Sequence, residues 1–332
     1  MPTISIIIAI YNRKDELFEL LGSLSRQTDR DFEVIVVDDG SQQTLLPTVE
    51  NFNDILDISF YRKENTGPGL TRNYGARRAK NDWLIFVDSD VIVEKNFIEN
   101  IKKNITQIPC DAFGGADKAH KGFNLMQKAI SYSMTSIFTT GGIRGNKQAV
   151  TRFQPRSFNM GVKKHVFESV GGFSEMRIGE DPDLSMTLWE KGYTTAFFDD
   201  IGVYHKRRVD LGKFSKQVYQ FGCARPILNQ RHPNFVKVTF AFPSLFLIGY
   251  VLGFFEYFML RKGFVLLLYG VYTFVIFFHA LYKTRNISIA AMAVISTYVQ
   301  MFSYGWGFLK SWFLLNILRQ KPEEAFPNHF HK

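Results

Sequence analysis

The chain has 332 residues, 46% of them hydrophobic, and a formal net charge of +9. This length suits one large domain with an appendage, or two domains, and the basic excess suits nucleic acid, a membrane surface or an anionic substrate as a partner. The two cysteines, Cys110 and Cys223, are far apart, which argues against a disulfide framework or a cysteine metal site and fits a reducing compartment.

The first quarter of the chain alternates between predicted strands and predicted helices. Residues 4–10 form a β-branched run that is typical of a strand buried on both faces, and too short for a secretory signal. Leucines at three- and four-residue spacing predict a helix over 17–24. Further strands are predicted at 32–37, 58–61 and 83–87, with a helix before the last. This order predicts an α/β fold with a mostly parallel sheet and right-handed crossovers.

Polar residues follow each of these strands at its carboxyl end, where ligands of parallel sheets bind. They are Tyr11 and Asn12, Asp38 and Asp39, residues 65–69, and Asp88 and Asp90. The pattern therefore predicts one ligand site at this edge of the sheet. A dinucleotide oxidoreductase would use the same edge, but the first strand is not followed by the G-x-G-x-x-G sequence that a pyrophosphate requires.

Asp88 and Asp90 are two carboxylates, two residues apart, at the end of a strand. Like charges so close are costly unless a cation or hydrogen-bond donors compensate them. A hard divalent ion, bound by one or two carboxylates and by substrate phosphates, would do so. The alternative is a turn, since Asp and Ser are good turn formers, and an Asp-x-Asp sequence alone does not decide between the two.

Five segments of the chain, in order, resemble the motifs of the family 2 inverting glycosyltransferases of the GT-A fold. They are residues 8–13 (Ile-Ala-Ile-Tyr-Asn-Arg), 36–41 (Val-Val-Asp-Asp-Gly-Ser), 65–76 with Arg72-Asn73, 86–90 (Phe-Val-Asp-Ser-Asp), and 171–184 with Gly-Gly-Phe and Glu-Asp-Pro-Asp-Leu. The resemblance covers about residues 3–208 and implies a Rossmann-like GT-A domain. It is specific for the family and says little about the sugar.

The resemblance implies a nucleotide-sugar donor, with UDP favoured over GDP. Tyr11 would stack on uracil, Asp39 would accept its ring N–H, and Arg72 would pair with the diphosphate or with Asp88. The full set of donor-binding residues is Ile10, Tyr11, Asn12, Asp38, Asp39, Asn65, Gly67, Arg72, Asp88, Ser89, Asp90 and Asn159. A simple turn at 38–41 and a solvated arginine are the alternatives.

The resemblance also implies a metal ion and a general base. Asp90 would bind Mn²⁺ or Mg²⁺ directly, Asp88 directly or through water, and His205 would complete the site. Either Asp181, which we favour, or Glu180 would take the proton from the acceptor hydroxyl.

The sequence Asp181-Pro182 also predicts a helix start with Asp181 as the N-cap, which does not exclude a catalytic role. Gly172 and Phe173 would lie near the acceptor.

The remainder of the chain indicates a membrane. Residues 201–237 are strongly basic and carry apolar residues at helical spacing, typical of a membrane-surface helix. Three apolar runs, 239–260, 263–282 and 287–309, are each near the length that crosses a bilayer. The basic connectors on both sides of the second run conflict with the positive-inside rule, so we expect two to three crossings.

Two charged residues of this region stand out. Glu256, inside the first apolar run, is expected to pair with Arg261 at its end. Arg225, in the basic segment, could bind the pyrophosphate of a lipid-linked acceptor.

We therefore predict a GT-A domain over 1–208, an interfacial segment over 209–237, a membrane region over 238–318 with two to three helices, and a polar tail over 319–332. The expected activity is a metal-dependent inverting hexosyl transfer to a lipid-linked or envelope-glycan acceptor. We expect it at the cytoplasmic face of the membrane, the inner membrane in a bacterium.

Two alternatives stay open: a processive polysaccharide synthase subunit, and a non-catalytic nucleotide-sugar-binding scaffold. Few spans and the lack of a Gln-x-x-Arg-Trp sequence weigh against the first, and the intact acids weigh against the second. A nucleic-acid partner is not expected, because the basic residues adjoin apolar runs without an aromatic stacking platform. The oligomeric state is left open.

Overall fold

The computed structural model describes residues 2–119, 123–140, 153–205 and 210–331. These residues form two compact units. The first holds residues 2–119, 153–205 and 328–331, and the second holds residues 123–140 and 210–327. The two units are described separately below.

Within its described residues, the first unit contains one eight-stranded sheet in the order β3-β2-β1-β4-β7-β6-β8-β5. Its strands are β1 (Ile4–Ile10), β2 (Glu33–Asp38), β3 (Asp57–Arg62), β4 (Trp83–Asp88), β5 (Val91–Val93), β6 (Ala112–Ala119), β7 (Asn159–Lys163) and β8 (Thr195–His205). The first four run parallel, which confirms the predicted crossovers. Because β7 runs antiparallel to both neighbours and β5 runs antiparallel to β8, the whole sheet is mixed.

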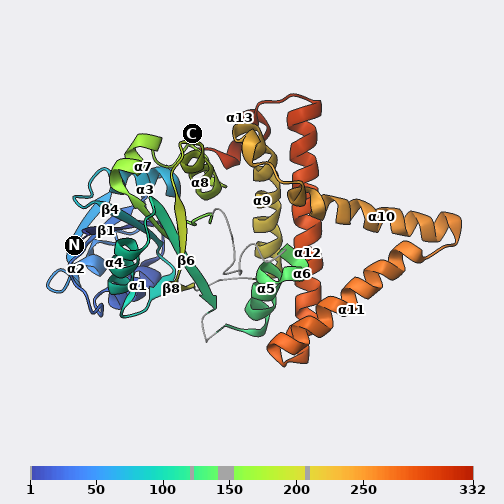
Figure 1. The fold of residues 1–332 in the computed structure, drawn as a ribbon, viewed down its shortest axis with the longest axis horizontal. Helices are drawn as coiled ribbons and strands as arrows, with labels where there is room; N and C mark the ends of the chain where they lie inside the picture. Colours follow the sequence, from blue (N-terminus) through green and yellow to red (C-terminus); the bar gives the residue numbers. More distant parts are fainter. Residues whose placement is uncertain (1, 120–122, 141–152, 206–209, 332) are drawn as a thin grey trace. The chain divides into compact units, whose positions relative to one another are not determined.

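Helices cover both faces of this sheet (Figure 1). They are α1 (Lys14–Leu24), α2 (Leu46–Glu50), α3 (Pro68–Ala76), α4 (Phe97–Gln107), α7 (Lys164–Val170) and α8 (Glu180–Glu190). Side chains alternate along a strand, so Ile6 and Ile8 pack with α1, α2 and α4, whereas Ile7 packs with α3, α7 and α8. This layered α/β arrangement confirms the predicted fold class.

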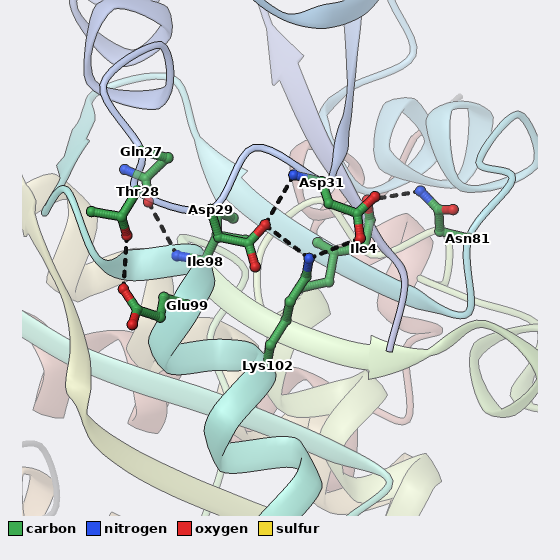
Figure 2. Close-up of polar contacts among 9 residues, drawn as sticks. All are labelled: Ile4, Gln27, Thr28, Asp29, Asp31, Asn81, Ile98, Glu99 and Lys102. Carbon is green, nitrogen blue, oxygen red and sulfur yellow. Dashed lines mark hydrogen bonds and ion pairs between the residues drawn. The ribbon is translucent and has the colours of Figure 1, made fainter. Parts of the chain in front are cut away.

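The connection between α1 and β2 is fastened to α4 by polar contacts (Figure 2). Lys102 Nζ lies 2.9 Å from Asp29 Oδ1 and 3.1 Å from Asp31 Oδ2. The hydroxyl of Thr28 donates to Glu99 at 2.8 Å. These contacts lie before β2, at the amino edge of the parallel strands. They therefore stabilise the fold at the edge opposite to the predicted site.

The second unit is helical. It contains α5 (Leu125–Thr135), α6 (Ile137–Thr140), α9 (Leu211–Arg231), α10 (Phe242–Leu260), α11 (Phe264–Thr284), α12 (Ile287–Trp312) and α13 (Pro322–Ala325), with short helical turns at Pro233–Phe235, Val238–Ala241 and Phe313–Ile317. Glycines let α9 and α12 approach closely. A Cβ on Gly222 would collide with the carbonyl of Tyr304, and one on Gly307 would collide with that of Tyr219. Helix α9, which lies within the basic segment 201–237, is thus packed against α12 in this unit.

Three helices of the described chain are long and apolar enough to cross a membrane. They are Val238–Leu260, Phe264–Thr284 and Ile287–Ile317, with mean hydropathies of 1.9, 2.1 and 1.4. The first and third contain the predicted runs 239–260 and 287–309, and the second contains all but the first residue of the run 263–282. Glu256, in the first, accepts a hydrogen bond from the backbone N–H of Val265 at 3.0 Å. The prediction that Glu256 pairs with Arg261 is wrong, because the carboxylate of Glu256 instead caps the first turn of α11.

Candidate active site

The turns after β1 and β2 are joined by hydrogen bonds of Asn12. Its backbone N–H donates to Ser41 Oγ at 2.9 Å, and its side-chain Oδ1 accepts from the N–H of Gln42 at 2.8 Å. Asn12 adopts a positive φ of 54°, which turns the chain sharply after Ile10. Ile10 itself is buried, whereas Tyr11 is 47% exposed and free to face a ligand.

The two aspartates after β2 have different surroundings. Asp38 is fully buried, and its Oδ1 accepts from the N–H of Ser41 at 2.9 Å, so it holds the turn. Asp39 accepts from the N–H groups of Thr66 and Gly67 at 2.9 and 2.8 Å. It also accepts from Lys63 Nζ at 2.6 Å. A carboxylate offers about four acceptor positions, so one remains on Asp39 for a ligand.

Arg72 connects the acids of two distant motifs. Its Nη2 lies 2.7 Å from Asp88 Oδ1, and its Nη1 lies 3.3 Å from Glu180 Oε1. The guanidinium is buried, and its carbon lies 5.4 Å from the centre of the Phe173 ring. Burial alone would lower the pKa of Arg72, but the charges of Asp88, Glu180 and Asp181 hold it above its ordinary value. The predicted contact between Arg72 and Asp88 is thus present.

The Asp-x-Asp pair fits a divalent cation chemically. Asp88 and Asp90 have side chains 32% and 17% exposed, and Arg13 Nη1 lies 2.7 Å from Asp90 Oδ2. Carboxylate oxygens suit Mg²⁺ and Mn²⁺, which complete their shells with phosphates. Across the described ranges, no three or more His, Cys, Asp or Glu residues gather into a metal-binding group. The backbone of His205 ends β8 opposite Val91, and its side chain lies outside the described part.

Helix α8 presents Glu180 and Asp181 in its first turn. The helix begins at Glu180, with Gly179 as the N-cap at a φ of 93°, so the prediction of Asp181 as N-cap is wrong by two positions. Glycine adopts this left-handed conformation without steric cost, which lets the helix start earlier than the Asp-Pro pair suggests. Both acids therefore lie within the turn and face Arg72.

Both acids hold their protons more tightly than free carboxylates do. Burial, with the nearby charge of Asp181, raises the pKa of Glu180 to about 8, although Arg72 opposes the shift. Burial also raises the pKa of Asp181, with Arg72 and a hydrogen bond to Ser157 opposing it. Asp181 Oδ1 is buried and accepts no hydrogen bond within the described chain. A buried carboxylate with a raised pKa and an oxygen without a donor is a candidate general base.

The remaining predicted residues of this unit are mostly buried. Phe173 lies in the core below Arg72. The side-chain amide of Asn73 donates to the carbonyl of Phe173 at 2.7 Å, and its oxygen accepts from the N–H of Phe173 at 2.9 Å. Gly172 has a φ of 74°, next to Asn73. Asn159 is buried, and its side-chain amide donates to the carbonyl of Ile201 at 2.7 Å.

Ser89, between the two acids of the Asp-x-Asp pair, is buried, and Asn65, in the loop after β3, is exposed.

Arg225 belongs to the second unit. Its guanidinium carbon lies 3.9 Å from the centre of the Phe240 ring. Its Nε and Nη1 are buried and donate no hydrogen bond in the described chain. A buried arginine with idle donors is a candidate anion-binding residue.

Sequence reasoning missed three residues of the first unit: Arg13, Lys63 and Asn73. Arg13 contacts Asp90, Lys63 contacts Asp39, and Asn73 contacts Phe173. Arg13 and Asn73 lie within two of the motifs that carry the family resemblance, but neither was assigned a role in the site. Lys63 stands in a polar stretch after β3 and offered no signal.

Comparison with known proteins identifies relatives of this fold. Residues 5–169 match the family described as Glycosyl transferase family 2. An uncharacterized glycosyltransferase of Haemophilus influenzae is 31% identical over 202 residues, which span 58% of this chain and 64% of that protein. Poly(ribitol-phosphate) beta-N-acetylglucosaminyltransferase TarS of Staphylococcus aureus is 35% identical over 166 residues, 44% of this chain and 29% of that protein. The chain thus spans less than two thirds of these relatives.

A solved structure shares the fold. Mannosyltransferase PcManGT from Pyrobaculum calidifontis, in complex with GDP-Man and Mn²⁺, has a TM-score of 0.58 and 16% identity, over 96% of this chain and 88% of that one. Its likeness supports the GT-A arrangement of the sheet and helices. Residues 5–169 therefore form a segment of glycosyltransferase family 2, most of it within the first unit, whose fold is of the GT-A type.

Proposed function

We propose that this protein is a metal-dependent inverting hexosyltransferase, anchored in a membrane, which uses a UDP-linked sugar. The observation that carries the proposal is the pair of contacts made by Arg72, 2.7 Å to Asp88 and 3.3 Å to Glu180. These contacts join the Asp-x-Asp pair to the Glu-Asp helix start. One acid pair could hold a metal ion that stabilises the leaving nucleotide, and the other could supply the base that deprotonates the acceptor.

In this proposal the donor lies across the carboxyl ends of β1, β2 and β4. Tyr11 stacks on the base, and Asp39 accepts its ring N–H. Arg72 turns from Asp88, and Arg13 turns from Asp90, to the diphosphate. Mn²⁺ or Mg²⁺, held by Asp88 and Asp90, with His205 as the predicted third ligand, supplies positive charge against the departing nucleotide. The Pyrobaculum mannosyltransferase, whose structure is a complex with GDP-Man and Mn²⁺, supports a metal-bound nucleotide sugar.

The transfer itself is a single displacement. The acceptor oxygen attacks the anomeric carbon from the side opposite the diphosphate, and the bond to the diphosphate breaks. Asp181 takes the proton of the acceptor hydroxyl, because its buried Oδ1 is free of protein donors in the described chain. Glu180 remains on Arg72 and holds the guanidinium in place.

The acceptor in this proposal is a lipid-linked or cell-envelope glycan at the cytoplasmic face. Three apolar helices support attachment to a bilayer. The Staphylococcus relative, whose name states transfer to poly(ribitol-phosphate), supports a polymeric envelope acceptor. Arg225, with its idle buried donors, would hold the pyrophosphate of a lipid-linked acceptor.

The test is nucleotide release by the full chain in detergent, with UDP- and GDP-sugars and Mn²⁺. We expect turnover with a UDP-sugar, and loss of both turnover and Mn²⁺ binding in Asp90→Ala. Asp54→Asn, an exposed acid in the turn before β3, is the matched control and should behave as wild type. Donor turnover by Asp90→Ala at the wild-type rate would refute the metal role, and failure of every donor to bind would refute the proposal.

A further inference from the structure

Residues 328–331 return to the first unit after the helices of the second. The chain end lies among the elements of this unit in Figure 1. Phe330 forms an antiparallel bridge with Met176. On either side, the N–H of Arg177 donates to the carbonyl of His329 at 2.7 Å, and the N–H of His331 donates to the carbonyl of Glu175 at 2.9 Å. His329 and Phe330 are buried, so this segment is docked by backbone pairing and by apolar contact.

The docked segment places the imidazole of His331 over Gly67. A Cβ on Gly67 would collide with the ring at Cε1, so only glycine leaves room for it. Gly67 has a φ of 86°, and its N–H is one of the donors bound by Asp39. The ring therefore lies beside the carboxylate that has one acceptor position left.

One nitrogen of this ring has no role in the folded chain. His331 Nε2 is buried and has no hydrogen-bond partner among the described residues. The charged groups that face the ring are Arg177, Lys63, Asp39 and Glu175. Burial, with Arg177 next, lowers the pKa of His331, so the ring is neutral at neutral pH and carries one donor and one acceptor. A buried polar atom that the folded chain leaves unpaired is available to a partner from outside the chain.

We propose that His331 is a specificity residue of the donor site and that its Nε2–H donates to a carbonyl oxygen of the nucleobase. This inference rests on the proposed function, in which Asp39 accepts the ring N–H of the base. The Asp39 carboxylate is an acceptor and the His331 Nε2–H is a donor beside it. Together they complement the edge of uracil on which N3–H adjoins a carbonyl. The carbonyl that His331 reaches in this inference is O4. Cytosine presents an unprotonated N3 and an amino group in place of O4, so both contacts fail.

The experiment measures UDP and CDP binding to the full chain in detergent with Mn²⁺, by calorimetry, for wild type, His331→Ala, His331→Gln and His165→Ala. One lost hydrogen bond of ordinary strength should weaken UDP binding about 3- to 10-fold in His331→Ala. CDP binding and kcat at saturating donor should not change. His331→Gln, which keeps an N–H donor, should recover part of the loss. His165→Ala, an exposed histidine on α7, is the matched control.

Two results would overturn the inference while leaving the proposed function intact. In the first, His331→Ala binds UDP as tightly as wild type, or loses UDP and CDP equally. In the second, it binds UDP more tightly, which would mean that the segment blocks the site. If wild type binds no nucleotide with Mn²⁺, the proposed function fails first, and this inference fails with it.

Discussion

The strongest test of the site separates its two adjacent acids, Asp181 and Glu180. Asp181→Asn keeps the shape of the side chain and removes the proposed base. Asp181 forms no ion pair with Arg72, whose nitrogens contact Asp88 and Glu180. We therefore expect donor binding to stay near the wild-type value while turnover falls about 10²- to 10⁴-fold, the usual contribution of a general base. This corresponds to about 3 to 5 kcal/mol in the barrier.

Glu180→Gln should behave differently at neutral pH. Burial raises the pKa of Glu180 to about 8, so the protonated form predominates at pH 7. Glutamine resembles that neutral form and can still accept from Arg72. We expect less than about a 10-fold loss of turnover at pH 7, since only the hydrogen bond of 3.3 Å is altered.

The assay is nucleotide release at saturating donor, with UDP affinity measured separately for each variant. It is run at pH 7 on the full chain, beside wild type. Equal losses in both variants would show that the two acids act as one unit. A larger loss in Glu180→Gln than in Asp181→Asn would move the base to Glu180 and refute the choice of Asp181.

Three further outcomes are expected. Removal of divalent cations by EDTA should abolish nucleotide release, and Mn²⁺ should restore it; activity that survives EDTA would contradict the metal. Glu180→Gln should raise the thermal midpoint more at pH 9 than at pH 5. The pKa of Glu180 in the folded wild type is raised from 4.5 to about 8, so the wild type loses stability as the pH rises between those values. A midpoint difference independent of pH would contradict this. Gly307→Ala should destabilise the helical unit by about 1–3 kcal/mol, because the new Cβ would meet the carbonyl of Tyr219. Gly270→Ala is the control and should be neutral, because a Cβ there meets nothing within 4 Å. Equal melting shifts in the two variants would contradict the close packing of α9 on α12.

The sequence predicted the parallel half of the sheet because its signals are local. The β-branched run at β1 and the leucine spacing of α1 each identify an element without reference to the rest of the chain. The pairing of β7 with β4 is not local: these strands are separated by α4, β6 and the segment up to Asn159. Their antiparallel register depends on the tertiary fold, so pattern reasoning had no means to find it.

The same distinction between local and long-range signals applies to the site. Motif residues at strand ends, such as Asp39 and Asp88, were identified, and the structure brings Asp88 to Arg72 as expected. The contact between Asn73 and Phe173 joins residues 100 apart in the sequence, and no local pattern marks it. The N-cap of α8, Gly179, lies two residues before the predicted cap, Asp181, because a glycine in the left-handed conformation can precede the first turn of a helix.

The electrostatics of the site explain why donor and cation would bind together. Arg72 is buried among Asp88, Glu180 and Asp181, and burial, with the nearby charge of Asp181, raises the pKa of Glu180 to about 8. A diphosphate alone would add negative charge to this group and be repelled. A divalent cation alone would compete with Arg72 for Asp88. If both bound, Asp88 and Asp90 would hold the cation and Arg72 would be available to the diphosphate, so each ligand would offset the electrostatic cost of the other.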